Sequence, residues 1–488
     1  MSSVQFAPLC LALLAITACS ENAATTSAPQ PPVVSHVAIA ENPNNALSLV
    51  VSATARNADS IRVLYQSARG EADATPFTAV RSASDTKIVV IGLRASNAYS
   101  LIVEGIGPAG RAASEPQSAT TGELPLAIRS LRFIGTGHAS DGFNLVVPIL
   151  PDTSMSADGF VLAFDDAGEI RWYHRFPGAW PVEAKQQPNG HITVFVGRSY
   201  GWQPNAGAFI ELTPAGETVR TFAAANGYYT DPHELLLGFR DTTVVAAHLL
   251  GYELRNYDLS SIGGSPQTLL AVHTIERHSA TGAVSFRWSS SDIFTPADWP
   301  LPNPRAVDLV HPSSLAIAPD GAYVVSLQGM DEITKIDSTS GAVLWRLGGR
   351  HNQFQILDDP LKGFLGQHNV QVLANGHLLM LDDHFRGVSA PARAVEYSLD
   401  TQSMVARMVW QYQPSGAVIS PSMGSVQRLP DGATLVGFGA AGRVDEVAGD
   451  GSVIWSATLR SGDTRTIAFY RVVRVVSLYE DRNVEMIR

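Results

Sequence analysis

The sequence predicts an all-β protein in which a six-bladed β-propeller follows a small β-sandwich. Three features support this prediction. Charged residues make up only 16% of the 488 residues, while glycine (41) and proline (29) are plentiful, a balance that suits short strands and turns. Alternating apolar residues, which mark strands with one buried face, recur along most of the chain. In addition, one strand pattern repeats six times after residue 131.

Each copy of the repeat is a turn followed by an apolar strand that ends in an aromatic residue. Successive aromatic residues lie 45 to 66 residues apart. Periods of about 40–50 residues with several strands each are typical of propeller blades, and longer periods indicate insertions at one rim. The last predicted strand, 470–478, is expected to return to the first blade and close the ring. The copies are 167–172, 215–222, 281–288, 340–345, 401–410 and 450–455.

The beginning of the chain resembles a lipoprotein signal peptide. Residues 1–18 carry no charge and contain an apolar run that is too short to span a bilayer. The run leads into the letters ITAC, which are similar to a bacterial lipobox ending at Cys19. We therefore expect lipidation at Cys19, a flexible tether at 19–32 and a location in the periplasm or cell envelope. Plain secretion with cleavage near Ala18 is the alternative.

Residues 33–122 are predicted to form the separate small β domain, and residues 131–488 the propeller. Short alternating runs in the first of these segments are separated by turn-rich pieces. The stretch 93–109 is similar to a strand pair of fibronectin type III domains, with Tyr99 at the place of the corner tyrosine. No chemical site is evident in this domain, so we expect a spacer or a docking module.

Composition excludes several classes of partner. The net charge of −11 argues against nucleic acid, because phosphate binding needs a basic surface. Only two cysteines occur, Cys10 inside the predicted signal peptide and Cys19 at its end. The mature chain should therefore contain no disulfide and no cysteine metal site. Contact with a membrane is expected only through the lipid anchor, and a homodimer is an assembly that the sequence leaves open.

Three histidines precede equivalent strands of the predicted blades. His233 lies in DPHELLLG, His311 opens HPSSLAIAPDG, and His368 opens HNVQVLANG. Inner strands of a propeller meet at a common mouth, so residues at their starts can converge although they are far apart in sequence. A metal site or satisfied polar residues at strand ends are the alternatives. A fourth hairpin offers Ser425 at this position, and His384 lies one hairpin from His368.

Several of these stretches together resemble the bacterial arylsulfotransferase family. The resemblance implies a six-bladed propeller that moves a sulfuryl group from an aryl sulfate to a phenolic acceptor without a nucleotide donor. It also implies that His368 becomes transiently sulfated and that His233 and His311 flank the sulfate. The residues that carry the resemblance are 311–383, 393–397, 424–436 and 470–479.

Imidazole chemistry agrees with these implied roles. Neutral imidazole is a nucleophile near pH 7, so it can attack sulfur and divide one difficult transfer into two easier steps. Protonated neighbouring imidazoles can donate hydrogen bonds to sulfate oxygens and a proton to the departing phenolate. No metal and no diffusible cofactor is expected, the partners are a small aryl sulfate and a phenol, and the kinetics should be ping-pong.

Two positions depart from the family pattern. The family's H-x-N-S appears here as HPSS, which places a hydroxyl at Ser313, and the family's arginine is replaced by Gln328. With Asn369, these two residues are the expected substrate contacts. Arginine offers a fixed charge and a bidentate fork, whereas glutamine offers one amide donor. In comparable oxyanion sites a lost donor costs about 3–4 kcal/mol, or about 10²–10³ in rate.

Either another cation replaces the missing arginine, or the protein is slow, altered in substrate or inactive. Cations near the motif are Arg350, Arg386 and Arg393. A second interpretation is therefore a catalytically weak or inactive envelope propeller that binds an anionic aromatic ligand or a partner protein. A quinoprotein dehydrogenase, which turns such as SGAVLW suggest, is disfavoured because the predicted mature chain lacks paired cysteines and has six repeats.

Overall fold

The computed structural model describes residues 28–81, 85–151, 157–198, 207–295, 298, 308–384, 391–462 and 464–479. In this part of the chain strands predominate, and the helical elements are short 3₁₀ turns: η1 (Ser260–Ile262), η2 (Ser290–Asp292) and η4 (Gln328–Met330). None of the described helices has the length and apolar character that crossing a membrane requires. The predicted signal peptide and lipidation site lie outside the described residues, as does Arg386.

Two sheets form the amino-terminal domain. The buried residues of β2 alternate along the strand, at Leu49, Val51 and Ala53, as a half-buried strand requires. The hydroxyl of Tyr99 accepts a hydrogen bond from the backbone N–H of Arg94 at 2.8 Å, the kind of bond that a corner tyrosine makes. One sheet contains β1 (Val33–Glu41), β2 (Leu49–Arg56) and β6 (Thr86–Val90). The other contains β3 (Ser60–Ser67), β4 (Ala72–Ala74), β5 (Thr78–Ala79), β7 (Ala98–Gly107), β8 (Gly110–Ala113) and β9 (Gln117–Thr120).

Beyond residue 131 the described strands form six further sheets, which we number 1 to 6 in chain order. Sheet 1 joins β11 (Phe143–Pro148), β12 (Gly159–Phe164) and β13 (Ile170–Phe176) to β36 (Phe469–Val475). Sheet 2 contains β14 (Trp180–Gln186), β15 (Ile192–Gly197), β16 (Ala208–Leu212) and β17 (Thr218–Phe222). Sheet 3 contains β18 (Tyr229–Arg240), β19 (Thr243–Tyr257), β20 (Thr268–Ser279) and β21 (Val284–Ser289).

The remaining sheets follow the same plan. Sheet 4 contains β22 (Pro312–Ile317), β23 (Tyr323–Leu327), β24 (Glu332–Ile336) and β25 (Val343–Gly348). Sheet 5 contains β27 (His368–Val372), β28 (Leu378–Asp382), β29 (Arg393–Asp400) and β30 (Val405–Tyr412), with β26 (Gln355–Leu357) parallel to β30. Sheet 6 contains β31 (Ser425–Arg428), β32 (Thr434–Phe438), β33 (Arg443–Val447) and β34 (Val453–Ser461), extended by β10 (Leu131–Gly137) and β35 (Arg465–Thr466).

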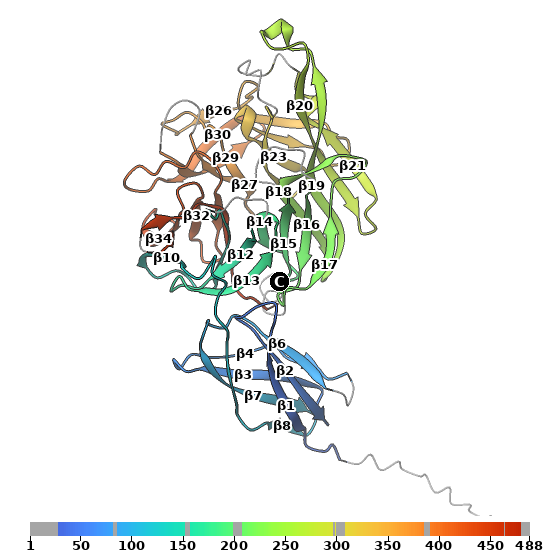
Figure 1. Cartoon of the computed structure of the whole chain (residues 1–488). Helices are drawn as coiled ribbons and strands as arrows, with labels where there is room; N and C mark the ends of the chain where they lie inside the picture. The colour runs from blue at the N-terminus through green and yellow to red at the C-terminus, as the bar shows by residue number, and fades with distance from the viewer. Residues whose placement is uncertain are drawn as a thin grey trace, which may run out of the picture.

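The innermost strands of these sheets close a ring. Each of β14, β18, β22, β27, β31 and β36 contacts the next in that order, and β36 contacts β14. The carboxyl-terminal strand β36 pairs with β11 of sheet 1, as predicted, and β10 pairs with β34 of sheet 6. Strands from both ends of the segment therefore join the ring, which is the arrangement of a β-propeller (Figure 1). The six sequence repeats fall on the fourth strand of each sheet, counted from the centre.

Side chains link three of the inner strands to their neighbours around the centre. Each is a hydroxyl or amide oxygen that accepts a hydrogen bond from a valine N–H on the next inner strand. Because these bonds are buried or partly buried, they fix how far each inner strand is shifted along its axis relative to its neighbour. Ser314 Oγ accepts from Val370 at 2.9 Å, Asn369 Oδ1 from Val426 at 3.0 Å, and Ser425 Oγ from Val472 at 3.0 Å.

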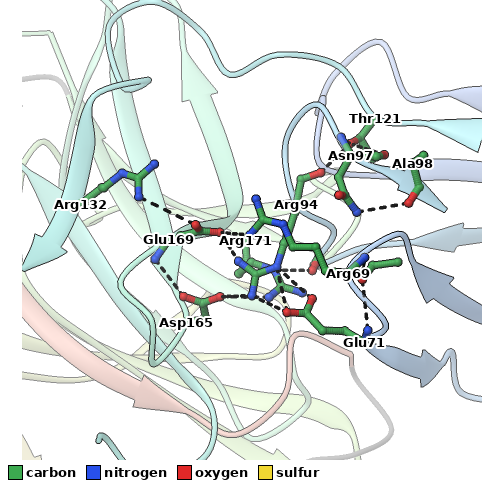
Figure 2. A network of polar contacts seen from close by, with 12 residues as sticks. Arg69, Glu71, Arg94, Asn97, Ala98, Thr121, Arg132, Asp165, Glu169 and Arg171 are labelled. Carbon is green, nitrogen blue, oxygen red and sulfur yellow. Dashed lines mark hydrogen bonds and ion pairs between the residues drawn. The ribbon is translucent and has the colours of Figure 1, made fainter. Parts of the chain in front are cut away.

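The amino-terminal domain docks on sheet 1 through a cluster of charges (Figure 2). The guanidinium of Arg94 pairs with Glu71 of its own domain at 2.8 Å and with Asp165 of the ring at 3.4 Å, and it also contacts Glu169. From the ring side, Arg171 Nε donates to the carbonyl of Gly92 at 2.8 Å. Carboxylates from both domains therefore share one arginine, which ties the amino-terminal domain to the sheet where the ring closes.

Candidate active site

His233 lies in an interruption of the innermost strand of sheet 3. The pairing of β18 with β19 shifts register between Thr230 and Leu235, and such bulges re-aim side chains next to active sites. The carboxylate of Asp231 holds the residue twice. Its Oδ1 accepts from the backbone N–H of His233 at 2.9 Å and lies 2.7 Å from the ring Nδ1. The imidazole is buried and has Nδ1 on a carboxylate, so Nε2 is the nitrogen directed to other partners.

His311 is held in the same way just before the innermost strand of sheet 4. The backbone N–H of His311 donates to Asp308 Oδ1 at 3.0 Å, and the ring Nδ1 contacts Oδ2 of the same carboxylate. Burial opposes the ionised form of Asp308, but its histidine partners, His273 and then His311, outweigh that effect and hold the pKa of Asp308 far below its usual value. A charged carboxylate therefore sets the orientation of this imidazole too.

The first two predicted histidines meet. The ring centroids of His233 and His311 are 4.8 Å apart in an edge-to-face arrangement, and the ring of Tyr470 lies 6.1 Å from His233. Burial lowers the pKa of His233, Asp231 opposes that shift, and His311 and Arg471 add to it. In the absence of an anion, His233 is therefore biased towards its neutral form.

His368 begins the innermost strand of sheet 5 and is also buried. Its Nδ1 lies 2.6 Å from Oδ2 of Asp383 and 3.1 Å from the carbonyl oxygen of Gly366. Asp383 is almost fully buried. Burial raises the pKa of Asp383 to about 6, against the opposing attraction of His368. Thus all three predicted histidines have a carboxylate at Nδ1.

The segment that carries His368 is anchored to the strand that follows His311. The hydroxyl of Ser313 donates to the carbonyl oxygen of Gln367 at 2.9 Å and shares a 2.9 Å hydrogen bond with Ser326. Since β22 and β27 are neighbours in the ring, His311 and His368 stand at the same end of adjacent inner strands. His233 lies on β18, the next inner strand on the other side of β22.

Several residues around this end of the ring have unusual backbone conformations. A positive φ is uncommon for residues other than glycine, and such conformations cluster at functional sites. His311 has a φ of 44°, Asn369 and His384 each have 48°, and Asp331 has 53°. Asp331 Oδ1 accepts the backbone N–H of Gly366, two residues before His368, at 2.8 Å. The loops at the site are therefore held in strained but hydrogen-bonded conformations.

The three expected substrate contacts lie close to the histidines, each in a different setting. Gln328 begins η4, where its backbone N–H donates to the carbonyl of His311 at 2.9 Å. Ser313 is fully buried, and its hydroxyl makes the contacts to Ser326 and Gln367. Asn369 uses its amide oxygen for the inter-strand bond to Val426. The structure thus gives Ser313 and Asn369 packing roles, and their contact with substrate remains a prediction.

Two of the three candidate replacement cations can be placed. Arg393 is fully buried, and its guanidinium donates to Asp359 and Asp382, each at 2.9 Å. It therefore serves as an internal cation of sheet 5, on β29. Arg350 lines a pocket of about 490 Å³ together with Lys362 and His384.

A further arginine that the sequence did not single out lies beside the histidines. Arg471, on β36, donates to the carbonyl of Ser313 at 2.8 Å and to Glu234 at 3.1 Å, and lies 3.5 Å from Glu183. Partly buried Lys185 contacts the same glutamates. Opposite charges are thus balanced inside the ring next to His233.

Sequence reasoning also missed the carboxylates that hold the three histidines. Asp231 and Asp308 stand two and three residues before their histidines, and Asp383 follows the hairpin that His368 opens. An acidic residue so close to a candidate histidine is a signal that could have been used, because it can fix the tautomer of the ring. In the described part of the chain, no group of three or more histidine, cysteine or acidic side chains is arranged to hold a metal ion.

Together, the fold and the site define a propeller protein with oriented imidazoles gathered at one end of its inner strands. The sequence model of the arylsulfotransferase (ASST) family matches residues 211–460, which include all three histidines. This match covers just over half of the chain, and the protein belongs to the arylsulfotransferase (ASST) family. Membership supports arylsulfotransferase-type activity at the level of the family.

Distant similarity to solved structures covers about two thirds of the chain. A protein of unknown function from Bacteroides caccae is 15% identical over 69% of this chain and 100% of its own, with a TM-score of 0.43. A virginiamycin B lyase from Staphylococcus aureus is 9% identical over 69% of this chain and 90% of its own, with a TM-score of 0.32. A putative gluconolactonase is 13% identical over 70% of this chain and 98% of its own, with a TM-score of 0.33. No curated protein matches the sequence.

Proposed function

We propose that this protein transfers a sulfuryl group from an aryl sulfate to a phenolic acceptor through a covalent sulfohistidine at His368. The observation that carries the proposal is the shared geometry of the three histidines, each with Nδ1 on a buried or nearly buried carboxylate. A carboxylate at Nδ1 keeps the proton on that nitrogen and leaves the lone pair on Nε2. Nε2 of His368 is then the nucleophile.

In the first step, Nε2 of His368 attacks sulfur as the bond between sulfur and the aryl oxygen breaks. The electron pair of that bond stays on the aryl oxygen, which takes a proton from one of the flanking imidazoles, His233 or His311. Although burial lowers the pKa of His233, an anionic sulfate beside the ring favours its protonated form. The phenol leaves, and the sulfuryl group remains on His368.

In the second step, the oxygen of the acceptor phenol attacks sulfur and the bond between nitrogen and sulfur breaks. The electron pair returns to Nε2 of His368, and the phenol's proton passes to the flanking imidazole that was deprotonated in the first step. Atoms and charges balance over the two steps, and the flanking imidazoles end in their starting state. Donor and acceptor use the same site in turn, so the kinetics should be ping-pong.

The proposal includes the finer architecture and the location. The six sheets are taken as six blades of one propeller, and the amino-terminal domain as a sandwich of the fibronectin type III kind. Closure of the inner strands into a ring and the corner-type bond of Tyr99 support these assignments. Lipid attachment at Cys19 would hold the enzyme at the cell envelope, where small phenols and aryl sulfates can reach it without crossing the inner membrane.

The test is an assay with p-nitrophenyl sulfate as donor. With phenol present, p-nitrophenolate should be released continuously and phenyl sulfate should accumulate in equal amount. Without an acceptor, release should stop after a burst of about one equivalent per enzyme, and mass spectrometry of the digested protein should find a sulfuryl group on the peptide that contains His368. Absence of release at high enzyme concentration would contradict the proposal and favour a propeller that only binds an anionic aromatic ligand.

Gln328→Arg is expected to raise the rate of the first step by about 10²-fold, because it returns a fixed cation to a place beside His311. Stopped-flow release of p-nitrophenolate measures this step. Gln402→Arg adds the same charge on an exposed turn of sheet 5 and should leave the rate unchanged. A lower rate in Gln328→Arg than in the control would show that the site depends on the glutamine amide.

A further inference from the structure

A fourth histidine lies between the carboxylates that hold the first two. His273, on β20 of sheet 3, has its Nε2 2.7 Å from Oδ1 of Asp308 and its Nδ1 3.5 Å from Oδ2 of Asp231. The other oxygens of the same carboxylates face the rings of His311 and His233. These five side chains form a continuous sequence of alternating rings and carboxylates, which we call the histidine–aspartate chain.

The position of His273 differs from those of the histidines that it connects. It lies on the third strand of its sheet, paired across to Tyr252 of β19, and does not precede an inner strand. Protein surrounds its ring on every side, and only 1% of the residue is accessible to solvent. Asp231 belongs to the same sheet, whereas Asp308 belongs to the segment that leads into sheet 4. His273 therefore joins two neighbouring sheets behind the site.

The two carboxylates beside His273 require a positive group between them. Two carboxylates buried close to one another repel unless a positive group lies between them. Burial disfavours the charged imidazole, but the attraction of Asp308 and Asp231 outweighs it and raises the pKa of His273 to about 9. Among the described residues, the ring of Tyr252 also lies 5.8 Å from the ring of His273, and the hydroxyl of Ser290 accepts a hydrogen bond from the backbone N–H of His273 at 3.0 Å.

We propose that His273 is a positioning residue, which holds Asp231 and Asp308 and through them sets the orientation of His233 and His311 as one pair. The proposal rests on the proposed function, because the pair matters only if its imidazoles serve the sulfate. With His273 protonated and both outer rings neutral, the histidine–aspartate chain has one net negative charge. It can therefore accept one proton at His233 or His311 when the anionic substrate binds, without leaving a buried excess of positive charge.

The test compares His273→Gln with His278→Gln. Glutamine keeps an amide donor near the place of Nε2 but removes the charge and the second contact. His278 is a matched control because it is buried on the same strand, with its Nε2 2.7 Å from Glu276, and has no contact with the histidine–aspartate chain. We expect His273→Gln to lower kcat/KM for the donor by about 10–100-fold and His278→Gln to leave it within about twofold.

A pH profile separates positioning from loss of packing. In the unsubstituted enzyme, the rate of the p-nitrophenolate burst should fall above pH 9, because His273 then gives up the proton that both carboxylates need. His273→Gln should show no such fall. A merely structural role would lower the rate equally at every pH. Equal kcat/KM and identical pH profiles for the two variants would overturn the proposal.

A second measurement does not depend on activity. In NMR spectra of unsubstituted protein labelled with ¹⁵N-histidine, both ring nitrogens of His273 should carry protons at pH 7.5. This measurement does not depend on the folding of a variant. In His273→Gln, the ring signals of both His233 and His311 should shift, while those of His368 should not. If the unsubstituted protein transfers no sulfuryl group, the proposed function fails and these spectra alone decide the role of His273. Unshifted signals of His233 and His311 would refute it.

Discussion

His368→Ala is expected to abolish sulfuryl transfer, with kcat lower by at least about 10⁴-fold. The reason is that alanine removes the only protein atom proposed to form a bond to sulfur, so the reaction loses its covalent intermediate. The burst of p-nitrophenolate should disappear together with continuous release. Stability should change little, because Asp383, whose pKa burial already raises to about 6, can take up a proton when its partner is missing.

His377→Ala is the matched control. His377 lies on the same hairpin as His368 and also has a carboxylate at Nδ1, since Glu396 Oε1 is 2.7 Å away, but it is at the opposite end of the strands. This variant should transfer the sulfuryl group at the normal rate, and its melting temperature should be close to that of the unsubstituted protein. Should His368→Ala still show a burst of one equivalent per enzyme, another residue would be the nucleophile and the proposed mechanism would be wrong.

The all-β ring of sheets and the places of the three histidines on it could be predicted from the sequence, because both leave periodic signals. Alternating apolar residues and turn residues set the strands, and the aromatic that ends each repeat falls on the fourth strand of a sheet. His311 and His368 could be paired because each begins a hairpin at an equivalent point, and the ring then brings equivalent points together. Local periodicity and ring symmetry therefore sufficed for these residues.

Other parts of the site depend on contacts that no spacing reveals. His273 occupies the interior of a strand and looks, in sequence, like any buried polar residue. It becomes part of the site because Asp308, which precedes sheet 4, lies against its ring. The docking of Arg94 on Asp165 and Glu169 is equally hidden, since it joins two domains through loops. Sequence reasoning found the residues that recur at equivalent places in several sheets. It missed those that are brought together only by contacts between different sheets and loops.

Asp383→Asn is expected to lower kcat by about 10³–10⁴-fold, although the nucleophile itself is unchanged. The carboxylate accepts the proton of His368 Nδ1 and so keeps the lone pair on Nε2. An amide has no charge, and its NH₂ group can donate to Nδ1, which would place the ring proton on Nε2 and block attack on sulfur. The substitution is nearly isosteric, so the buried packing should persist, and Asp320→Asn on an exposed turn serves as the control.

The pH dependence supplies an independent check on this role. Burial raises the pKa of Asp383 to about 6, so below that pH the folded protein binds a proton on this carboxyl group and loses the charged acceptor for Nδ1–H. Burst rates of the unsubstituted enzyme should therefore fall as the pH drops through 6, and Asp320→Asn should show the same fall. In Asp383→Asn, the part of this fall that protonation of Asp383 causes should be absent. A variant that keeps both the full rate and the unaltered acid limb would show that Asp383 does not control the tautomer of His368.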